Sequence, residues 1–225
     1  MATKINKPIL SITKDHFKYD QKYYDEFSGG ITYDVNRPIR RVCYKRVSLL
    51  PSNASMISFA FGNAAQMSKY SRLFSAVYGY EINPASIDDA KKHGFDNKVV
   101  LRDVTEHLFR PSFPKATMAS CYYLFEHLQD SQVAEVCLNM MSAADMNLIK
   151  LTTSDDPNYV KDPSHLNPKL PKEWNTFLQS IYASQGWVRH SWHVREWSFV
   201  RKSVLVRLKN AQILAARAVD QAWSS

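Results

Sequence analysis

Apolar and polar positions alternate in blocks through the middle of the chain. Five apolar runs have the length and composition of buried strands: 55–61, 75–80, 98–101, 116–122 and 147–152. Segments of helical character stand between most of these runs: 64–73, 84–93 and 131–143. Strands that alternate with helices predict an α/β architecture with a mainly parallel sheet.

The last third of the chain changes this order. Segment 154–171 is dense in Asp, Asn, Ser and Pro, so we expect a long loop there. A helix is expected over 171–183, followed by two strand-like segments at 187–192 and 198–208. Because no helical segment separates these two strands, we expect them to form an antiparallel hairpin at one edge of the sheet.

Length and composition indicate one folded core with two appendages. The chain has 225 residues, and 45% of them are apolar, which provides a substantial core. We expect helical pieces over 1–50, the core over 51–209 and a C-terminal helix over 210–225. No run reaches the roughly 18 to 20 apolar residues that a membrane span needs, so no membrane partner is expected.

The cysteines bear on the cellular compartment. Cys43, Cys121 and Cys137 are an odd number and form no Cys-x-x-Cys pair. This pattern predicts neither a disulfide framework nor a zinc site of the cysteine type, and it favours a reducing, cytoplasmic setting.

The charge leaves open which kind of partner the protein has. A formal charge of +8 and an isoelectric point near 9.3 suit an anionic partner such as nucleic acid or a phosphorylated substrate. No RNP, KH or zinc-finger signature accompanies the charge. Nucleic acid is therefore an alternative partner that the sequence does not favour.

The first apolar run leads into a glycine-containing loop. The sequence MISFAFGNAAQ, from Met56 to Gln66, contains a small-x-Gly-x-small pattern centred on Gly62. In nucleotide-binding βαβ units, such a turn brings the backbone and a helix N-terminus close to the ligand. Such a loop also occurs at ordinary strand ends, so the residues after the following strands have to show whether it binds a nucleotide.

Carboxylates follow the next two predicted strands. Glu81 stands 19 positions after Gly62, where a nucleotide site places an acid that accepts hydrogen bonds from a ribose. Asp103 stands 22 positions further on and is suited to accept the exocyclic amine of an adenine. The dinucleotide pattern is an alternative, but no tyrosine has a lysine four positions later, as a single-domain short-chain reductase would need.

The sequence resembles class I S-adenosylmethionine-dependent methyltransferases of the small-molecule type over roughly residues 20–208. The resemblance is carried by Ser58–Ala64, by Glu81-Ile82-Asn83, by LRDVTE around Asp103, by ASCYYLFEHLQD at 119–130 and by the loop TTSDDPNYVKDPSHLNPKLPKEW. It implies a Rossmann-like fold with a seven-stranded, mostly parallel sheet, an antiparallel edge hairpin and helices on both faces.

The resemblance also implies S-adenosylmethionine as the cofactor and a set of residues that bind it: Ser58, Ala60, Phe61, Gly62, Asn63, Ala64, Glu81, Ile82, Asp103, Val104, Cys121 and Tyr122. The family usually has an acid where Ser58 stands and glycines where Ala60 and Ala64 stand. Alanine restricts positive φ angles, so weaker cofactor affinity is expected. Tyr23, Tyr24 and Tyr33 lie in a segment that folds over the cofactor in similar enzymes.

Methyl transfer to a hydroxyl needs a base and good alignment. His165, in the loop after the fifth predicted strand, is the candidate base, and a packing role is its alternative. His127 is expected to make a structural contact in its turn. No metal site is expected, because Asp162 and His165 alone, three positions apart, are weak evidence for one.

Three functions are consistent with the sequence. The first is O-methylation of a small metabolite or sugar hydroxyl. The second is a binding or scaffold subunit without turnover, which the altered glycine loop suggests. The third is a nucleic-acid methyltransferase, although an Asn/Asp-Pro-Pro-Tyr/Phe segment is absent after the fourth strand. The C-terminal helix is expected to cover the sheet or join a partner subunit, and the oligomeric state is not predicted.

Overall fold

The computed structural model describes residues 50–193 and 195–204. The helical pieces expected over 1–50 lie outside these residues apart from Leu50, and this includes Tyr23, Tyr24 and Tyr33. The helix expected over 210–225 also lies outside them.

Seven strands form one sheet in the order β3-β2-β1-β4-β5-β7-β6. Their bounds are β1 Ser55–Phe59, β2 Ala76–Glu81, β3 Val99–Leu101, β4 Ala116–Tyr122, β5 Ala144–Lys150, β6 Trp187–His193 and β7 Glu196–Arg201. The pairs among β1 to β5 are parallel, whereas β7 runs antiparallel to both β5 and β6. The predicted fold class, a mostly parallel sheet with an antiparallel edge hairpin, is confirmed.

Four helices of regular length connect the strands: α3 Ala64–Ser71, α4 Pro84–Lys92, α5 Asp130–Ala143 and α6 Pro171–Ser184. Short 3-10 turns are η2 Asp96–Lys98, η3 Phe125–His127 and η4 Tyr159–Lys161. Local sequence explains two of the helix starts, because the side chains of Asn63 and Asn83 accept backbone hydrogen bonds as N-caps of α3 and α4. No helix in the described ranges is long and apolar enough to cross a membrane.

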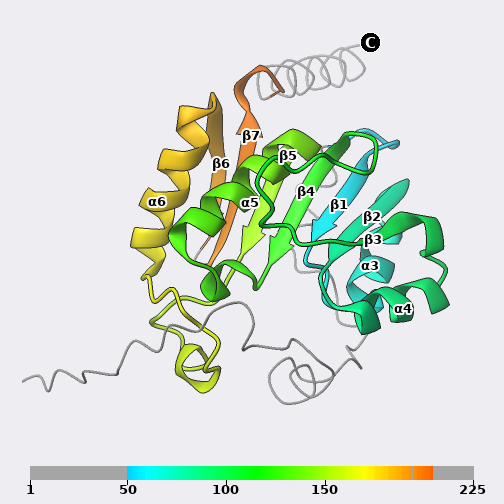
Figure 1. Ribbon diagram of the computed structural model, residues 1–225. Coiled ribbons are helices and arrows are strands. Elements are labelled where there is room, and N and C mark those ends of the chain that lie inside the picture. Colours follow the sequence, from blue (N-terminus) through cyan, green and yellow to red (C-terminus); the bar gives the residue numbers. More distant parts are fainter. Residues whose placement is uncertain (1–49, 194, 205–225) are drawn as a thin grey trace, which may run out of the picture.

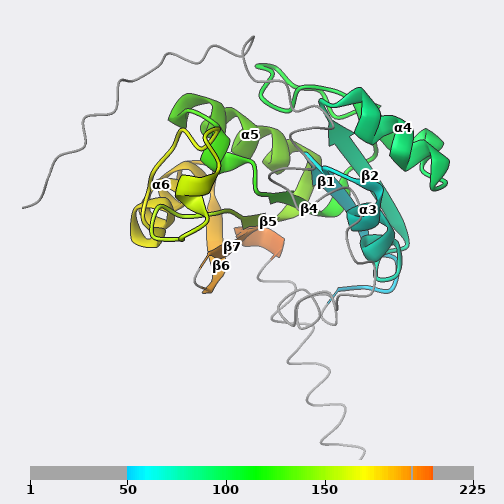
Figure 2. The same ribbon diagram turned by 90° about the horizontal axis from the view of Figure 1, so that it is seen from below.

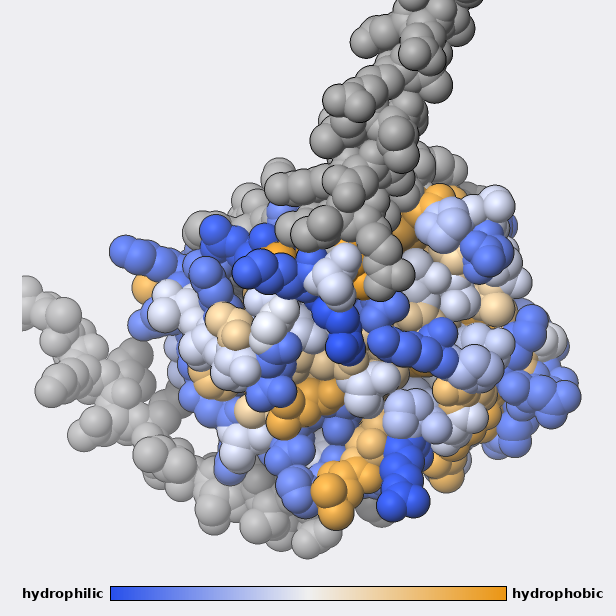
Figure 3. Space-filling view, turned by 90° about the horizontal axis from the view of Figure 1, so that it is seen from above, coloured by the Kyte–Doolittle hydropathy of each residue, from blue (hydrophilic) through white to orange (hydrophobic). Residues whose placement is uncertain are grey.

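The helices cover both faces of the sheet (Figures 1 and 2). Helices α5 and α6 pack on one face in a core that includes Trp174 and Tyr182, while α3 and α4 pack on the other face around Met67 and Ile87. Tyr182 stacks on Phe199 of β7 with ring centroids 3.9 Å apart. The end seen from above, opposite the carboxyl ends of the parallel strands, shows hydrophilic residues interspersed with small hydrophobic groups (Figure 3).

Two predicted boundaries differ from the structure by three residues or more, and the others by at most two. Strand β5 begins at Ala144, directly after helix α5, whereas the apolar pattern placed its start at 147. Strand β7 covers Glu196–Arg201, and residues 202–204 are helical, so the strand expected over 198–208 ends early.

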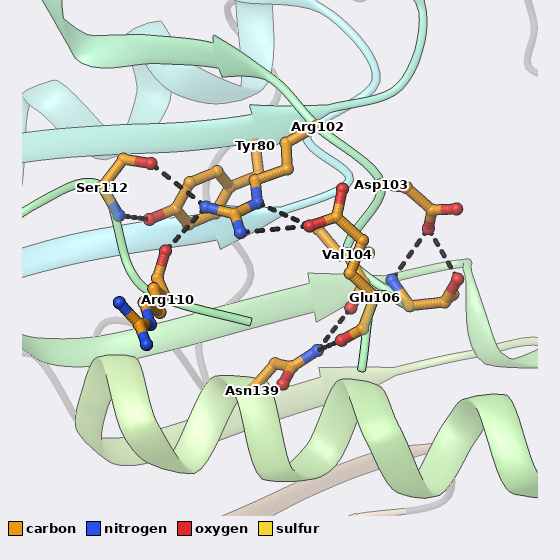
Figure 4. Close-up of polar contacts among 9 residues, drawn as sticks. Tyr80, Arg102, Asp103, Val104, Glu106, Arg110, Ser112 and Asn139 are labelled. Atoms are coloured by element: carbon orange, nitrogen blue, oxygen red, sulfur yellow. Dashed lines mark hydrogen bonds and ion pairs between the residues drawn. The ribbon is translucent and has the colours of Figure 1, made fainter. Parts of the chain in front are cut away.

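The connection from β3 to β4, residues 102–115, contains no helix, and Arg102 holds it together (Figure 4). The guanidinium donates to Glu106 Oε2 at 3.1 Å and to the Arg110 carbonyl at 2.6 Å. It also lies 4.2 Å from the ring centre of Phe109. One side chain thus gathers residues from both halves of the connection.

The same connection is attached to the core at two further points (Figure 4). The backbone N–H of Ser112 donates to the Tyr80 hydroxyl at 2.8 Å. The side-chain amide of Asn139, on α5, donates to the carbonyls of Val104 and Glu106. These bonds fix the path of the chain immediately after Asp103.

Candidate functional site

The candidate site lies at the carboxyl ends of the parallel strands, at the lower side of Figure 1. Open α/β sheets bind their ligands at this edge. The predicted residues come from loops and strand ends of β1, β2, β3 and β4, which are neighbours in the order β3-β2-β1-β4. The structure therefore brings these segments side by side, and the binding roles of the residues stay predictions.

The loop after β1 turns through residues with positive φ angles. Ala60 has a φ of 54° and Gly62 a φ of 72°. Asn63 then caps helix α3, and Ala64 is the first residue of that helix, where its N–H donates to Asp89 Oδ2 at 3.2 Å. Of the two alanines at positions where the sequence resemblance implies glycine, only Ala60 adopts a conformation that favours glycine.

Glu81 ends β2 and joins that strand to the loop. Its Oε2 atom accepts from the N–H of Gly62 at 2.9 Å. Its Oε1 atom accepts from the N–H groups of Ile82 at 2.8 Å and Asn83 at 3.1 Å. Burial raises the pKa of this carboxyl above its ordinary value, and the three backbone donors oppose that shift.

Apolar and acidic groups flank Glu81 on the side of β3. Ile82 is 51% exposed and Leu101, at the end of β3, is 52% exposed. Asp103 follows β3, is half-buried, and accepts from both the N–H and the hydroxyl of Thr105. An apolar surface beside an acceptor is suited to a flat heterocycle that carries an amino group.

The side chains of several predicted binding residues point into the core. Phe61, Val104 and Cys121 are buried among apolar residues, so any contact with a ligand would involve their backbone. Phe61 packs so tightly on β2 that a Cβ atom on Gly79 would lie 2.6 Å from its ring. Burial also raises the pKa of the Cys121 thiol well above its usual range.

Ser58 and Tyr122 lie on the face that carries α3. Ser58 is fully buried and accepts a hydrogen bond from Ser120 of β4 at 3.3 Å. Tyr122, at the end of β4, packs edge-on against Tyr70 of α3 with ring centroids 6.4 Å apart. At the position where the sequence resemblance implies an acid, this chain has Ser58, which forms a neutral serine pair with Ser120 between β1 and β4.

Backbone strain in the described residues occurs in loops that follow parallel strands. Three non-glycine residues there have positive φ angles: Ala60 after β1, Leu108 after β3 and Tyr123 after β4. Such conformations cost about 1 to 3 kcal/mol each and cluster at functional sites. Ala60 and Tyr123 directly follow their strands, so two of these strained positions lie at this edge.

A second group of polar residues forms where the loop 151–170 meets the turn after β4. The carbonyl of Glu126 accepts from the N–H groups of Leu166 and Asn167. This contact brings His165 beside His127, with ring centroids 4.7 Å apart. Glu126, His127 and His165 each have one atom that could bind a metal ion, and each of these three atoms lies within 4.8 Å of the other two.

Hydrogen bonds set the tautomers of both histidines. His165 Nδ1 lies 2.7 Å from the Tyr159 carbonyl, which can only accept, so Nδ1 carries the proton. Ser164 Oγ donates to Asp162 at 2.6 Å and therefore accepts from His127 Nδ1 at 2.8 Å. Each neutral ring consequently has its lone pair on Nε2.

Burial shifts the acid–base behaviour of this group. Burial is the main cause that raises the pKa of Glu126 to about 7. Burial, helped by the neighbouring His165, lowers the pKa of His127 to about 4. The side chain of His165 is 7% exposed. Near neutral pH, His127 is therefore neutral.

The sequence predicted His165 as a base and His127 as a turn contact. It predicted no metal site, because Asp162 and His165 alone are weak evidence for one. The structure adds Glu126 to these two histidines. The adjacent pair Glu126-His127 after a strand was a usable signal, but the path of the loop 151–170 was needed to bring His165 to it.

No protein-family model matches the sequence, and a search of curated proteins finds no significant match. The fold, by contrast, matches solved structures.

DesVI from Streptomyces venezuelae superposes with a TM-score of 0.60 at 11% identity, over 82% of this chain and 99% of that chain. A magnesium protoporphyrin IX methyltransferase from Synechocystis PCC 6803, solved with bound SAH, gives a TM-score of 0.57 at 11% identity, over 81% and 98% of the two chains. The small RNA methyltransferase HEN1 gives 0.59 at 11% identity, over 77% of this chain and 26% of that chain. Similarity at this level shows a common architecture, and the chain thus has the fold of class I S-adenosylmethionine-dependent methyltransferases.

Proposed function

We propose that the protein is an S-adenosylmethionine-dependent methyltransferase that methylates a hydroxyl group of a small metabolite. The observation that carries this proposal is Glu81, a buried carboxylate at the end of β2 that also holds the N–H of Gly62 in the preceding loop. Its oxygens have about four accepting positions, and three are used by backbone donors. A ribose hydroxyl can donate to the remaining one.

The neighbouring groups fit the other parts of such a cofactor. Ile82 and Leu101 offer exposed apolar surface for an adenine, and the Asp103 carboxylate can accept from its amino group. The backbone of Ala60 and Gly62 would border the methionine part of a cofactor bound in this way. When bound, S-adenosylmethionine supplies an electrophilic methyl group on a sulfonium.

His165 is the candidate base that removes the proton from the acceptor's hydroxyl group. Its Nδ1 proton is engaged with the Tyr159 carbonyl, which leaves the Nε2 lone pair as the basic position. A metal ion would use the same lone pair, and metal-binding measurements separate these two roles.

The surface of this edge favours a small acceptor with apolar parts. Apart from Leu138, the large hydrophobic residues that are exposed in the described chain lie at strand ends or in loops of the candidate site: Ile82, Leu101, Leu108, Tyr123, Val160, Leu166 and Leu170. A nucleic-acid acceptor, as a polyanion, would be expected to bind to a continuous basic surface.

A nucleic-acid acceptor is the second candidate function. It is favoured by the net charge of +8 and by the structural similarity to a small RNA methyltransferase. Binding of RNA that weakens steeply with salt and competes with methylation of small acceptors would support it.

Calorimetric titration with S-adenosylhomocysteine tests the proposed function. Saturable binding is expected for the wild type, and Glu81→Gln should weaken it by about 10- to 100-fold, because one charge-assisted hydrogen bond is lost. Asp88→Asn, which removes an exposed acid from α4, is the matched control and should bind as the wild type does. A folded protein that binds nothing at millimolar ligand would contradict the proposal and favour the scaffold function.

A further inference from the structure

We propose that Glu126, His127 and His165 form a binding site for a divalent transition-metal ion of the Zn²⁺ class. The three residues come from the turn after β4 and from the loop 151–170, and one donor atom of each lies within 4.8 Å of the other two. Two imidazoles and a carboxylate are a common ligand set of catalytic zinc sites.

The first support is an unsatisfied carboxylate oxygen. Glu126 is fully buried, its Oε1 accepts from the N–H of Thr152 at 2.8 Å, and its Oε2 accepts no hydrogen bond from any described residue. A buried carboxylate oxygen without a donor is costly. A cation bound at Oε2 would compensate this cost, and no described side chain does so.

The second support is the arrangement behind the ligands. His127 Nδ1 donates to Ser164, which donates to Asp162, and His165 Nδ1 donates to the Tyr159 carbonyl. Metal-bound histidines have such outer partners, which fix the tautomer and the ring orientation. Both rings are therefore held in the tautomer that has its lone pair on Nε2, the atom that would form the metal–nitrogen bond, and Asp162 Oδ2 lies 3.7 Å from Nε2 of His165.

The ligand types select the metal. Imidazole nitrogens suit Zn²⁺ and its neighbours in the first transition row, whereas Mg²⁺ and Ca²⁺ prefer sites made of oxygen atoms. Bonds of about 2.0 to 2.2 Å place the ligand atoms of a tetrahedral site about 3.3 Å apart. The three ligand atoms now lie up to 4.8 Å apart, so side-chain rotation would have to shorten the distances between them by roughly 1.5 Å at most.

Metal binding would have two consequences. It would cross-link the turn after β4 to the loop 151–170, which are now joined by hydrogen bonds to the Glu126 carbonyl. Three protein ligands also leave a fourth position for water or for an oxygen of the acceptor. That last role rests on the proposed methylation, with the metal in place of His165 as the group that activates the acceptor, whereas metal binding itself does not.

The test is a titration of the metal-free chain of 225 residues with Co²⁺ and Zn²⁺, without any nucleoside. We expect one equivalent of Co²⁺ per chain to give the visible absorption of a tetrahedral complex, and calorimetry to show saturable Zn²⁺ binding. Glu126→Gln keeps the acceptor for Thr152 and should weaken Zn²⁺ binding at least 100-fold. His165→Asn should have a similar effect.

Two further variants make the result specific. Ser164→Ala keeps all three ligands but removes the partner of His127, and it should weaken binding about tenfold. His107→Ala removes a surface histidine that pairs with Glu135 at 3.1 Å, and it should leave binding unchanged. Circular dichroism checks that each variant is folded. Equal affinity in all variants, or no saturable binding at millimolar metal by the folded wild type, would overturn the proposal.

Discussion

At the scale of single residues, Ala60 is the position where the loop after β1 stores strain. Its φ of 54° lies in the left-handed region, which costs an L-residue about 1 to 2 kcal/mol relative to glycine. Ala64, at the other position where the sequence resemblance implies glycine, begins helix α3 and carries no such strain. The two alanines therefore affect the loop differently, although the sequence shows them as equal departures.

Ala60→Gly should stabilise the protein and improve the candidate cofactor site. The relief of strain exceeds the entropy that glycine adds to the unfolded chain, so we expect a net gain of about 0.5 to 1 kcal/mol in the free energy of unfolding. Urea titration measures this gain, and calorimetry with S-adenosylhomocysteine should show tighter binding. Ala64→Gly is the matched control and should lower stability by up to about 1 kcal/mol; a gain there would contradict the assignment of strain to Ala60.

Glu81 should link stability to pH. Its folded-state pKa lies above the ordinary value of 4.5 because of burial. The native state therefore holds the proton more tightly, and the contribution to stability is complete below pH 4.5 and is lost as the pH rises through the folded pKa. Urea unfolding at a series of pH values from 4.5 upward should show this fall, and the difference from Glu81→Gln isolates it.

Ligand binding at Glu81 should change with pH in the opposite direction. A ribose hydroxyl donates to the ionised carboxylate, so affinity should rise over the range in which stability falls. Adenosine is the suitable probe, because it carries the ribose without the titratable groups of an amino acid. An affinity for adenosine that is constant across this range would separate Glu81 from the ribose site.

At the scale of structural elements, the connection 102–115 depends on Arg102. This guanidinium contacts Glu106, the Arg110 carbonyl and the Phe109 ring, and its side chain is 21% exposed. In the absence of a helix in this connection, these contacts hold the chain that leads away from Asp103.

Arg102→Ala should destabilise the protein by about 1 to 3 kcal/mol, because several hydrogen bonds to a partly buried charge are lost. Arg102→Lys keeps the charge but not the planar fork, so most of the loss should remain. Urea unfolding measures both variants, and hydrogen exchange should increase over residues 103–112. If Arg102→Lys is as stable as the wild type, the positive charge alone, without the planar guanidinium, is sufficient to stabilise the connection 102–115.

The elements themselves were largely predictable from hydrophobic periodicity. The strand 116–122 was predicted with the bounds that the structure has, because apolar residues fill it and prolines precede it. The start of β5 was missed because nothing between Ala143 and Ala144 interrupts the chain: neither glycine nor proline marks the change from helix to strand. The end of β7 was missed because the apolar run Val204-Leu205-Val206 has strand propensity, although the chain is already helical at 202–204.

At the scale of the whole molecule, parallel topology explains which part of the site could be predicted. The carboxyl ends of β1 to β4 meet at one edge, so Gly62, Glu81 and Asp103 were expected side by side from strand order alone. The group of Glu126, His127 and His165 depends instead on how the loop 151–170 folds back. Such a path follows from contacts between distant residues, such as those of the Glu126 carbonyl, and no local pattern specifies it.

The direct junction of α5 and β5 restricts how this protein can change its length. Between Ala143 and Ala144 a single change of backbone conformation, to a φ of −149° and a ψ of 170°, turns helix into strand. One inserted residue would rotate the packed face of α5 by about 100° or move every side chain of β5 to the opposite face of the sheet. Inserted residues should therefore destabilise the protein far less at exposed positions of the loops 102–115 and 151–170, away from Arg102, Asp103 and His165, than at this joint, where no loop residue can take up a change in length.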